Sequence, residues 1–193
     1  MIPAYLANLQ LPQVFAAYCA SVDSYIIEST SDEHVVDSES QRISGFVSDS
    51  FGQAEDAAGK YFAVENPSGQ SYALLQVDNG IIKTSATKKC DCALGNDTHL
   101  CFIEFKANAN SEKTSTIQKN YRKAMEQLTT TIGFFDNYMS ACGLDIRSLR
   151  TTEAFICFRQ GYPRKTSSQM NYQVAFATAN NGIPLSFERK KVL

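Results

Sequence analysis

The chain has 193 residues, of which 44% are hydrophobic and 20% charged, and it contains no Trp. No apolar run approaches the roughly 20 residues needed to cross a bilayer, and the N-terminus lacks the pattern of a signal peptide. We therefore expect a cytoplasmic protein that is not embedded in a membrane. The net charge of −2 is uneven, because residues 1–82 carry two basic and eleven acidic side chains, whereas residues 83–193 carry sixteen and nine. A polyanion would be attracted to the second half, unless the halves pair with each other or with a second subunit.

The first fifty residues are predicted to form an acidic, helical arm. In residues 13–28 apolar side chains recur near one face of a helix. Residues 28–50 are rich in Ser, Asp and Glu, and predict either a second, polar helix or a mobile acidic linker. Helix-forming residues over 53–62 predict a short helix at the start of a second unit, a domain over residues 51–193.

Residues 71–107 are predicted to form antiparallel strands. Asn79-Gly80 is a strong hairpin signal between strands over 71–77 and 81–84. A further strand is expected around 88–94, followed by a turn and a strand over 100–106.

A long helix is predicted over 116–141. Ile117, Tyr121, Ala124 and Leu128 begin an apolar stripe at three- and four-residue intervals, and Gly143 can end the helix in a left-handed turn. Strands over 153–159, 172–178 and 183–187 are expected to follow. This order predicts an α/β or α+β fold, a sheet with helices against it.

Three residues in the predicted strands have the chemistry of a metal site. Side chains alternate across a strand, so Glu104 and Lys106 are expected on one face of a largely apolar strand. A buried carboxylate and ammonium are unfavourable unless they pair or bind something. Asp91, in the preceding strand, can reach Glu104 across a hairpin. Two carboxylates beside a lysine suit Mg²⁺, which polarises phosphoryl oxygens and activates water.

The pattern of Asp91 followed by Ile103-Glu104-Phe105-Lys106 resembles the signature of the PD-(D/E)XK, or restriction-endonuclease-like, nuclease superfamily. The resemblance covers roughly residues 50–160, and Cys90 replaces the proline usual before the aspartate. It implies a mixed four-stranded sheet flanked by helices, with a helix directly after the Glu-x-Lys strand. It also implies that Asp91, Glu104 and the backbone carbonyl of Phe105 bind Mg²⁺ or Mn²⁺, that Lys106 is the catalytic lysine, and that the substrate is nucleic acid, most plausibly DNA.

Other residues are expected to support this centre. Many superfamily members add a glutamate from an earlier helix, and Glu55 is the candidate here, with Glu65 as the alternative. Gln118 is expected to position substrate or water. The basic residues expected to contact phosphates are Lys119, Arg122 and Lys123, with Arg147, Arg150, Arg159, Arg164 and Lys165 extending the positive half. Each of these also has an ordinary interpretation as a solvated surface residue.

Several alternatives remain open at this level. Cys90, Cys92 and Cys101 form the one cysteine cluster, but their spacing is unlike that of structural zinc sites, and we interpret them as small buried hydrophobic residues. A catalytically inactive protein of the same fold could bind nucleic acid or a protein partner. The acidic N-terminal region could act as an interaction module or seal a homodimer.

Overall fold

The computed structural model describes residues 1–163 and 168–193, which form a mixed α/β fold with two mixed sheets. The larger sheet has six strands in the order β1-β5-β6-β7-β8-β9. Pairing is antiparallel from β1 through β7 and parallel from β7 to β9. The strands are β1 (Ile26–Ser29), β5 (Tyr72–Gln76), β6 (Cys92–Gly95), β7 (His99–Phe105), β8 (Thr151–Cys157) and β9 (Leu185–Ser186).

The smaller sheet has the order β10-β4-β2-β3, with β10 and β4 parallel and the other pairs antiparallel. Its strands are β2 (Glu33–Ser38), β3 (Ile43–Phe46), β4 (Tyr61–Glu65) and β10 (Lys190–Val192). Thus β2 and β3, from the first fifty residues, share a sheet with strands from the rest of the chain. The prediction of a polar helix or mobile linker over 28–50 is wrong. These residues form β2 and β3, and Val35 packs with Phe62 in the core between the two sheets.

The N-terminal segment is less helical than the predicted arm. Helical structure there is limited to three short pieces, and the helix predicted over 13–28 is wrong, because the chain turns after Val14 and enters β1 at Ile26. The helix predicted over 53–62 is shorter, because Gly59 has φ of +68° and β4 begins at Tyr61. The helices are η1 (Ala4–Leu9), α1 (Leu11–Val14), η2 (Val22–Tyr25), α2 (Gln53–Ala57), α3 (Thr114–Ala141), α4 (Ile146–Leu149) and α5 (Ser168–Ala179).

The long helix is confirmed as α3, but two predicted strands are not. Residues 172–178 lie in α5, where the buried Phe176 packs in the core. Directly after α5, the Asn180 amide donates to Thr129 of α3 at 3.0 Å. Tertiary packing thus overrides a segment whose aromatic and β-branched residues favour a strand. The turn at Asn79-Gly80 is present, yet Ile82 makes only an isolated bridge to Asp78 instead of a second hairpin strand.

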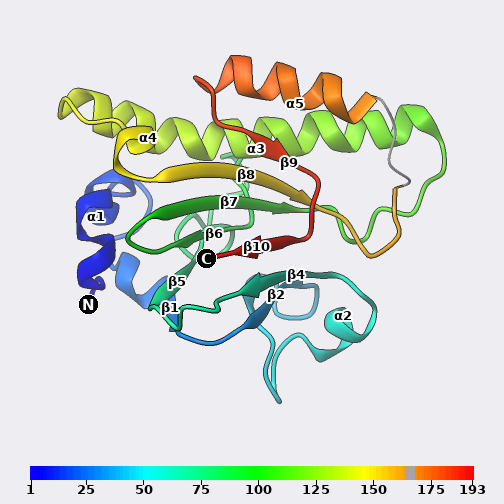
Figure 1. The fold of residues 1–193 in the computed structure, drawn as a ribbon, viewed down its shortest axis with the longest axis horizontal. Helices are drawn as coiled ribbons and strands as arrows, with labels where there is room; N and C mark the ends of the chain where they lie inside the picture. The colour runs from blue at the N-terminus through cyan, green and yellow to red at the C-terminus, as the bar shows by residue number, and fades with distance from the viewer. Residues whose placement is uncertain (164–167) are drawn as a thin grey trace.

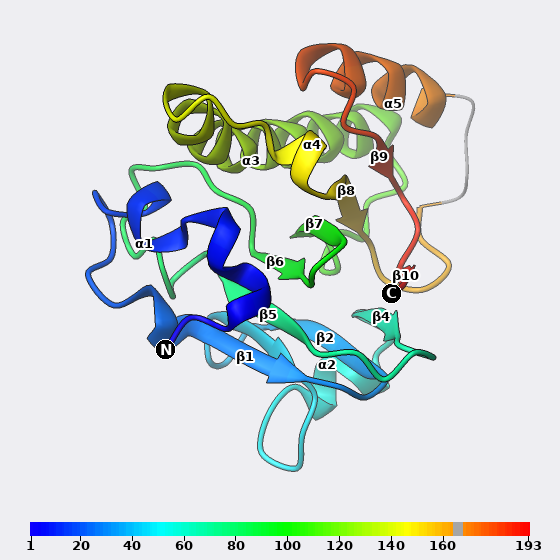
Figure 2. The same cartoon turned by 60° about the vertical axis from the view of Figure 1, so that its left-hand side comes forward.

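The layers are helices, the six-stranded sheet and the four-stranded sheet (Figures 1 and 2). Helices α3 and α5 cover one face of the larger sheet, and β2, β4 and α2 lie on the other side (Figure 2). One apolar core, including Phe102 and Phe135, fills the helical side, and a second, including Phe62 and Ile103, lies between the sheets. Within the described part of the chain, no helix has the length and apolar character needed to span a membrane.

Candidate metal centre

Asp91, Glu104 and Lys106 meet where β6 begins and β7 ends. The last ladder pair of these strands is Cys92 with Ile103, so one step further places Asp91 beside Glu104. Beyond this pair a side chain replaces the backbone acceptor, because Asp91 Oδ2 accepts the Phe105 N–H at 2.5 Å. This hydrogen bond and the strand pairing therefore hold the two carboxylates side by side at the ends of two central strands.

Glu104 and Lys106 form an ion pair on the side of β7 that faces α3. Their side chains are 1% and 14% exposed, so water screens this pair poorly. Lys106 Nζ also donates to Gln127 Oε1 at 3.1 Å, and Gln127 Nε2 donates to the Lys89 carbonyl at 3.0 Å. Gln127 of α3 thereby links the Lys106 ammonium at the end of β7 to the backbone that precedes β6.

Burial and the repulsion between like charges raise the pKa values of the carboxylates at these strand ends. Burial raises the pKa of Glu104 to about 7, opposed by Lys106. The pKa of Asp91 is also raised well above its ordinary value, first by burial and then by the charge of Glu104. A cation bound between the two carboxylates would relieve the repulsion between them.

One oxygen atom in this cluster lacks a partner. Glu104 Oε2 is buried, and no described residue forms a hydrogen bond with it. An unsatisfied carboxylate oxygen beside a second carboxylate fits a hard cation, which prefers oxygen ligands and retains waters. Among the described residues no set of three His, Cys, Asp or Glu side chains forms a ready-made metal cage. The two carboxylates are therefore the candidate side-chain ligands, and the resemblance adds the backbone carbonyl of Phe105.

Two acids that the sequence did not single out act on this centre. Asp37, from β2 of the smaller sheet, lies in the same cleft wall as Phe105 and Lys106, and its pKa is raised by burial. Its charge in turn raises the pKa of Asp91 and Glu104. Asp78 contributes to the raised pKa of Glu104 and is paired with Lys89 at 3.0 Å. Asp37 had no local signal, because it reaches the site only through the pairing of β2 with β4.

Glu55 and Gln118 do not make the direct contacts with the centre that were expected of them. Glu55 Oε1 accepts the Glu39 N–H at 3.0 Å, and its charge acts on the centre through Asp37. Gln118 precedes Gln127 by nine residues, which is about 180° around the helix and ~14 Å along it. The α3 side chain that contacts Lys106 is therefore Gln127. Glu65, the alternative to Glu55, pairs with Lys190 at 3.0 Å.

Two clefts flank the centre. The Lys60 cleft has a volume of about 200 Å³, and the Lys123 cleft one of about 290 Å³. The Lys60 cleft is lined by Asp37, Lys60, Phe105, Lys106, Ala107, Asn108, Ala109 and Asn120. The Lys123 cleft is lined by Arg42, Asp78, Asn79, Ser85, Thr87, Lys88, Lys89, Lys123 and Gln127.

Only one of the three basic α3 residues expected to bind phosphate lines a cleft. Lys123 lines its cleft beside Gln127, whereas Lys119 and Arg122 are exposed and line neither cleft. Arg147 is paired with Asp136 and Asp145, and Arg150 is buried against the N-terminal segment. Arg159 lines a separate pocket, and Arg164 and Lys165 lie outside the described residues.

The cysteines are placed as small apolar side chains. Cys90 packs in the helical-side core, while Cys92 and Cys101 pack between the two sheets. Burial raises the pKa of all three thiols. These features oppose the thiolate state that zinc requires.

No family model, no curated protein and no solved structure matches this chain. The functional argument therefore depends on the geometry of the centre itself.

Proposed function

We propose that the protein is a metal-dependent nuclease of the PD-(D/E)XK type that hydrolyses phosphodiester bonds in DNA. The observation that carries the proposal is the buried Glu104 carboxylate, which has one oxygen on Lys106 and the other without a partner among the described residues. Asp91, also buried and with a raised pKa, lies beside it. A purely structural ion pair would not call for a second, repelling carboxylate at the same strand ends.

The order of elements supports the same proposal. Strands β5, β6 and β7 form an antiparallel meander, α3 follows β7 directly, and β8 returns parallel to β7. We infer that these four strands and α3 correspond to the mixed sheet, with a helix after the Glu-x-Lys strand, that the sequence resemblance implies. The smaller sheet and the N-terminal segments would then be additions to that core.

In the proposed reaction, Asp91, Glu104 and the carbonyl of Phe105 would hold Mg²⁺ or Mn²⁺. The bound ion would supply Lewis-acid polarisation of the phosphoryl oxygen and a bound water of lowered pKa. Lys106 would orient the attacking water and offset the negative charge that develops on the phosphate. Gln127 positions Lys106, because its carbonyl oxygen accepts from Nζ while its amide is tied to the backbone.

The two clefts supply a path for the phosphate backbone on either side of the centre. Lys60 lines one cleft, and Arg42, Lys88 and Lys123 line the other. Phosphate contacts of this kind position a nucleic acid without reading its sequence. Binding is therefore expected to weaken as salt concentration rises.

The test is metal-dependent cleavage of plasmid and single-stranded DNA by the purified protein. We expect cutting with Mg²⁺ or Mn²⁺ and none with EDTA, and we expect Asp91→Asn, Glu104→Gln and Lys106→Met each to lower the rate at least 100-fold. Lys190→Met is the matched control, because it breaks an exposed Glu–Lys pair outside the site. Wild-type protein that cuts nothing, or Lys106→Met that cuts at the wild-type rate, would contradict the proposal.

A further inference from the structure

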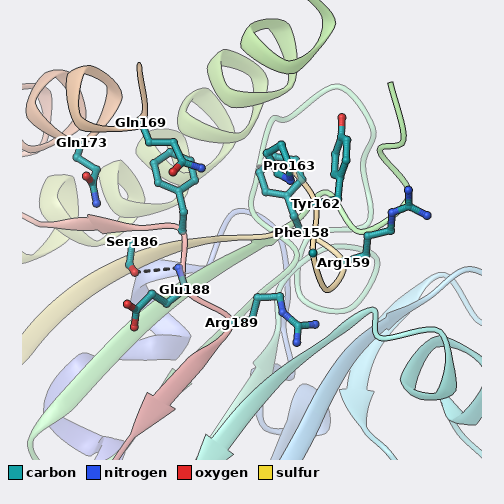
Figure 3. Close-up of a pocket in the computed structure, with 11 residues that line it drawn as sticks. Phe158, Arg159, Tyr162, Pro163, Gln169, Gln173, Ser186, Glu188 and Arg189 are labelled. Atoms are coloured by element: carbon teal, nitrogen blue, oxygen red, sulfur yellow. Dashed lines mark hydrogen bonds between the residues drawn. The ribbon is translucent and has the colours of Figure 1, made fainter. Parts of the chain in front are cut away.

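A third cavity, of about 650 Å³, opens beside the candidate metal centre and has a different lining. We call it the arginine–aromatic pocket. Figure 3 shows its walls: Gln169 and Gln173 extend from α5, Arg159 and Tyr162 come from the segment after β8, and Arg189 lies at the base. Phe158 and Phe187 complete the lining with aromatic surface. The pocket thus combines rings, guanidinium groups, amides and the Glu188 carboxylate in one concave site.

The pocket lies next to the metal centre because β7 and β8 are parallel neighbours. Lys106 N–H, at the end of β7, donates to the Cys157 carbonyl at 2.7 Å, and the pocket residue Phe158 follows Cys157 directly. The carbonyl of Gly59 accepts both the Gln160 N–H at 2.9 Å and Arg189 Nη1 at 2.6 Å. Lys60, the next residue, lines the Lys60 cleft. The backbone at Gly59 and Lys60 therefore connects the Lys60 cleft to the segments that carry Gln160 and Arg189.

The side chains of the pocket are held in place before any ligand binds. The Arg189 guanidinium lies 4.7 Å from the ring centre of Tyr61, and that of Arg159 lies 5.4 Å from the ring centre of Tyr162. The hydroxyl of Tyr162 donates to the Ser111 carbonyl at 2.7 Å. Phe187 packs against Tyr121 with ring centres 5.0 Å apart. A preorganised site of this kind loses little conformational entropy on binding.

We propose that the arginine–aromatic pocket binds an unpaired nucleotide of the substrate, and that the protein therefore acts on single-stranded or end-frayed nucleic acid. The base of a nucleotide offers a flat face to Phe187 and donor groups to the Oε1 atoms of Gln169 and Gln173, whose Nε2 atoms donate within the protein. The phosphate of the nucleotide suits Arg159. A base inside a duplex has both faces stacked and cannot enter such a recess, whereas every unpaired base has a free π-face. The inference rests on the proposed function and adds the strandedness of its substrate.

A single introduced tryptophan tests the pocket directly, because the chain has none of its own. In Phe187→Trp, measured with EDTA so that nothing is cut, a single-stranded 12-nucleotide DNA should quench the tryptophan fluorescence. A matched oligonucleotide with abasic sugars and the same charge should not quench it. Tyr18→Trp is the control, because Tyr18 is exposed and packs against Phe134, away from the pocket.

Affinity measurements complete the test. We expect Arg159→Ala, and separately Phe187→Leu, to weaken binding of the single strand about fivefold or more and to leave duplex binding within twofold. Equal quenching by the abasic oligonucleotide, or equal losses for single strand and duplex, would overturn the inference. If wild-type protein still cuts DNA with Mg²⁺, that result would leave the proposed nuclease activity standing. A protein that binds single strands in the pocket but never cuts would instead refute the nuclease proposal.

Discussion

Gln127 Oε1 lies 3.1 Å from Nζ of Lys106, and this hydrogen bond joins the middle of α3 to the end of β7. The same amide donates to the Lys89 carbonyl, so the helix also holds the segment that leads into Asp91. Thr131, one turn further along α3, accepts the Cys90 N–H at 2.8 Å. Helix α3 thus sets the positions of both strand ends that form the candidate centre.

The first prediction concerns Gln127 as a positioning residue. Gln127→Met keeps the size of the side chain but removes both hydrogen bonds, so we expect kcat for Mg²⁺-dependent cleavage to fall about tenfold or more with KM little changed. Gln127→Glu keeps an acceptor for Lys106 and should retain more activity than the Met variant. Gln118→Met, on the opposite side of the helix, should cut at nearly the wild-type rate. A larger loss at Gln118 than at Gln127 would contradict this assignment.

The second prediction is a pH dependence of stability without metal. The folded-state pKa of Glu104 is raised from 4.5 to about 7, so this group favours folding below pH 4.5, and that contribution is lost as pH rises to about 7. Glu104→Gln removes the titration. Its free energy of unfolding relative to wild type should therefore increase between pH 4.5 and 7, by up to about 3 kcal/mol. Urea unfolding in EDTA at several pH values measures this, and a pH-independent difference would contradict it.

The third prediction links metal binding to the same protons. Mg²⁺ competes with the protons on Glu104 and Asp91, whose pKa values are raised, so metal should bind more tightly as pH rises through about 7. At a fixed, subsaturating Mg²⁺ concentration the rise in melting temperature should be larger at pH 8 than at pH 6. Asp91→Asn should lose this rise, whereas Glu126→Gln, an exposed acid paired with Lys88, should keep it. Identical shifts in both variants would argue against the assigned ligands.

The fourth prediction separates the two effects of Asp37. Its charge repels the carboxylates of Asp91 and Glu104, so Asp37→Asn should make the metal-free protein more stable by about 1 kcal/mol. The same change should weaken Mg²⁺ binding several-fold, because it removes negative charge beside the ion. Calorimetric titration with Mg²⁺ and urea unfolding in EDTA measure the two quantities. Asp49→Asn, an exposed acid, is the control, and it should change neither.

The sequence alone predicted the parts of the centre that depend on local periodicity. The two-residue alternation of a strand predicted that Glu104 and Lys106 share a side, and the structure pairs them. The spacing of apolar residues predicted α3, which the structure confirms over Thr114–Ala141. Both signals are strong because burial on one side repeats with the period of the element.

Only the tertiary structure decided which distant residues join these elements. Asp37 reaches the site because β2, in a segment expected to be helical or mobile, pairs with β4, and Gln127 rather than Gln118 contacts Lys106 because of how α3 packs on β7. Residues 172–178 were expected to form a strand, and packing of Phe176 on the helical side makes them part of α5. Such contacts join residues far apart in the chain, and their free energy appears only when the layers assemble, so no local pattern records them.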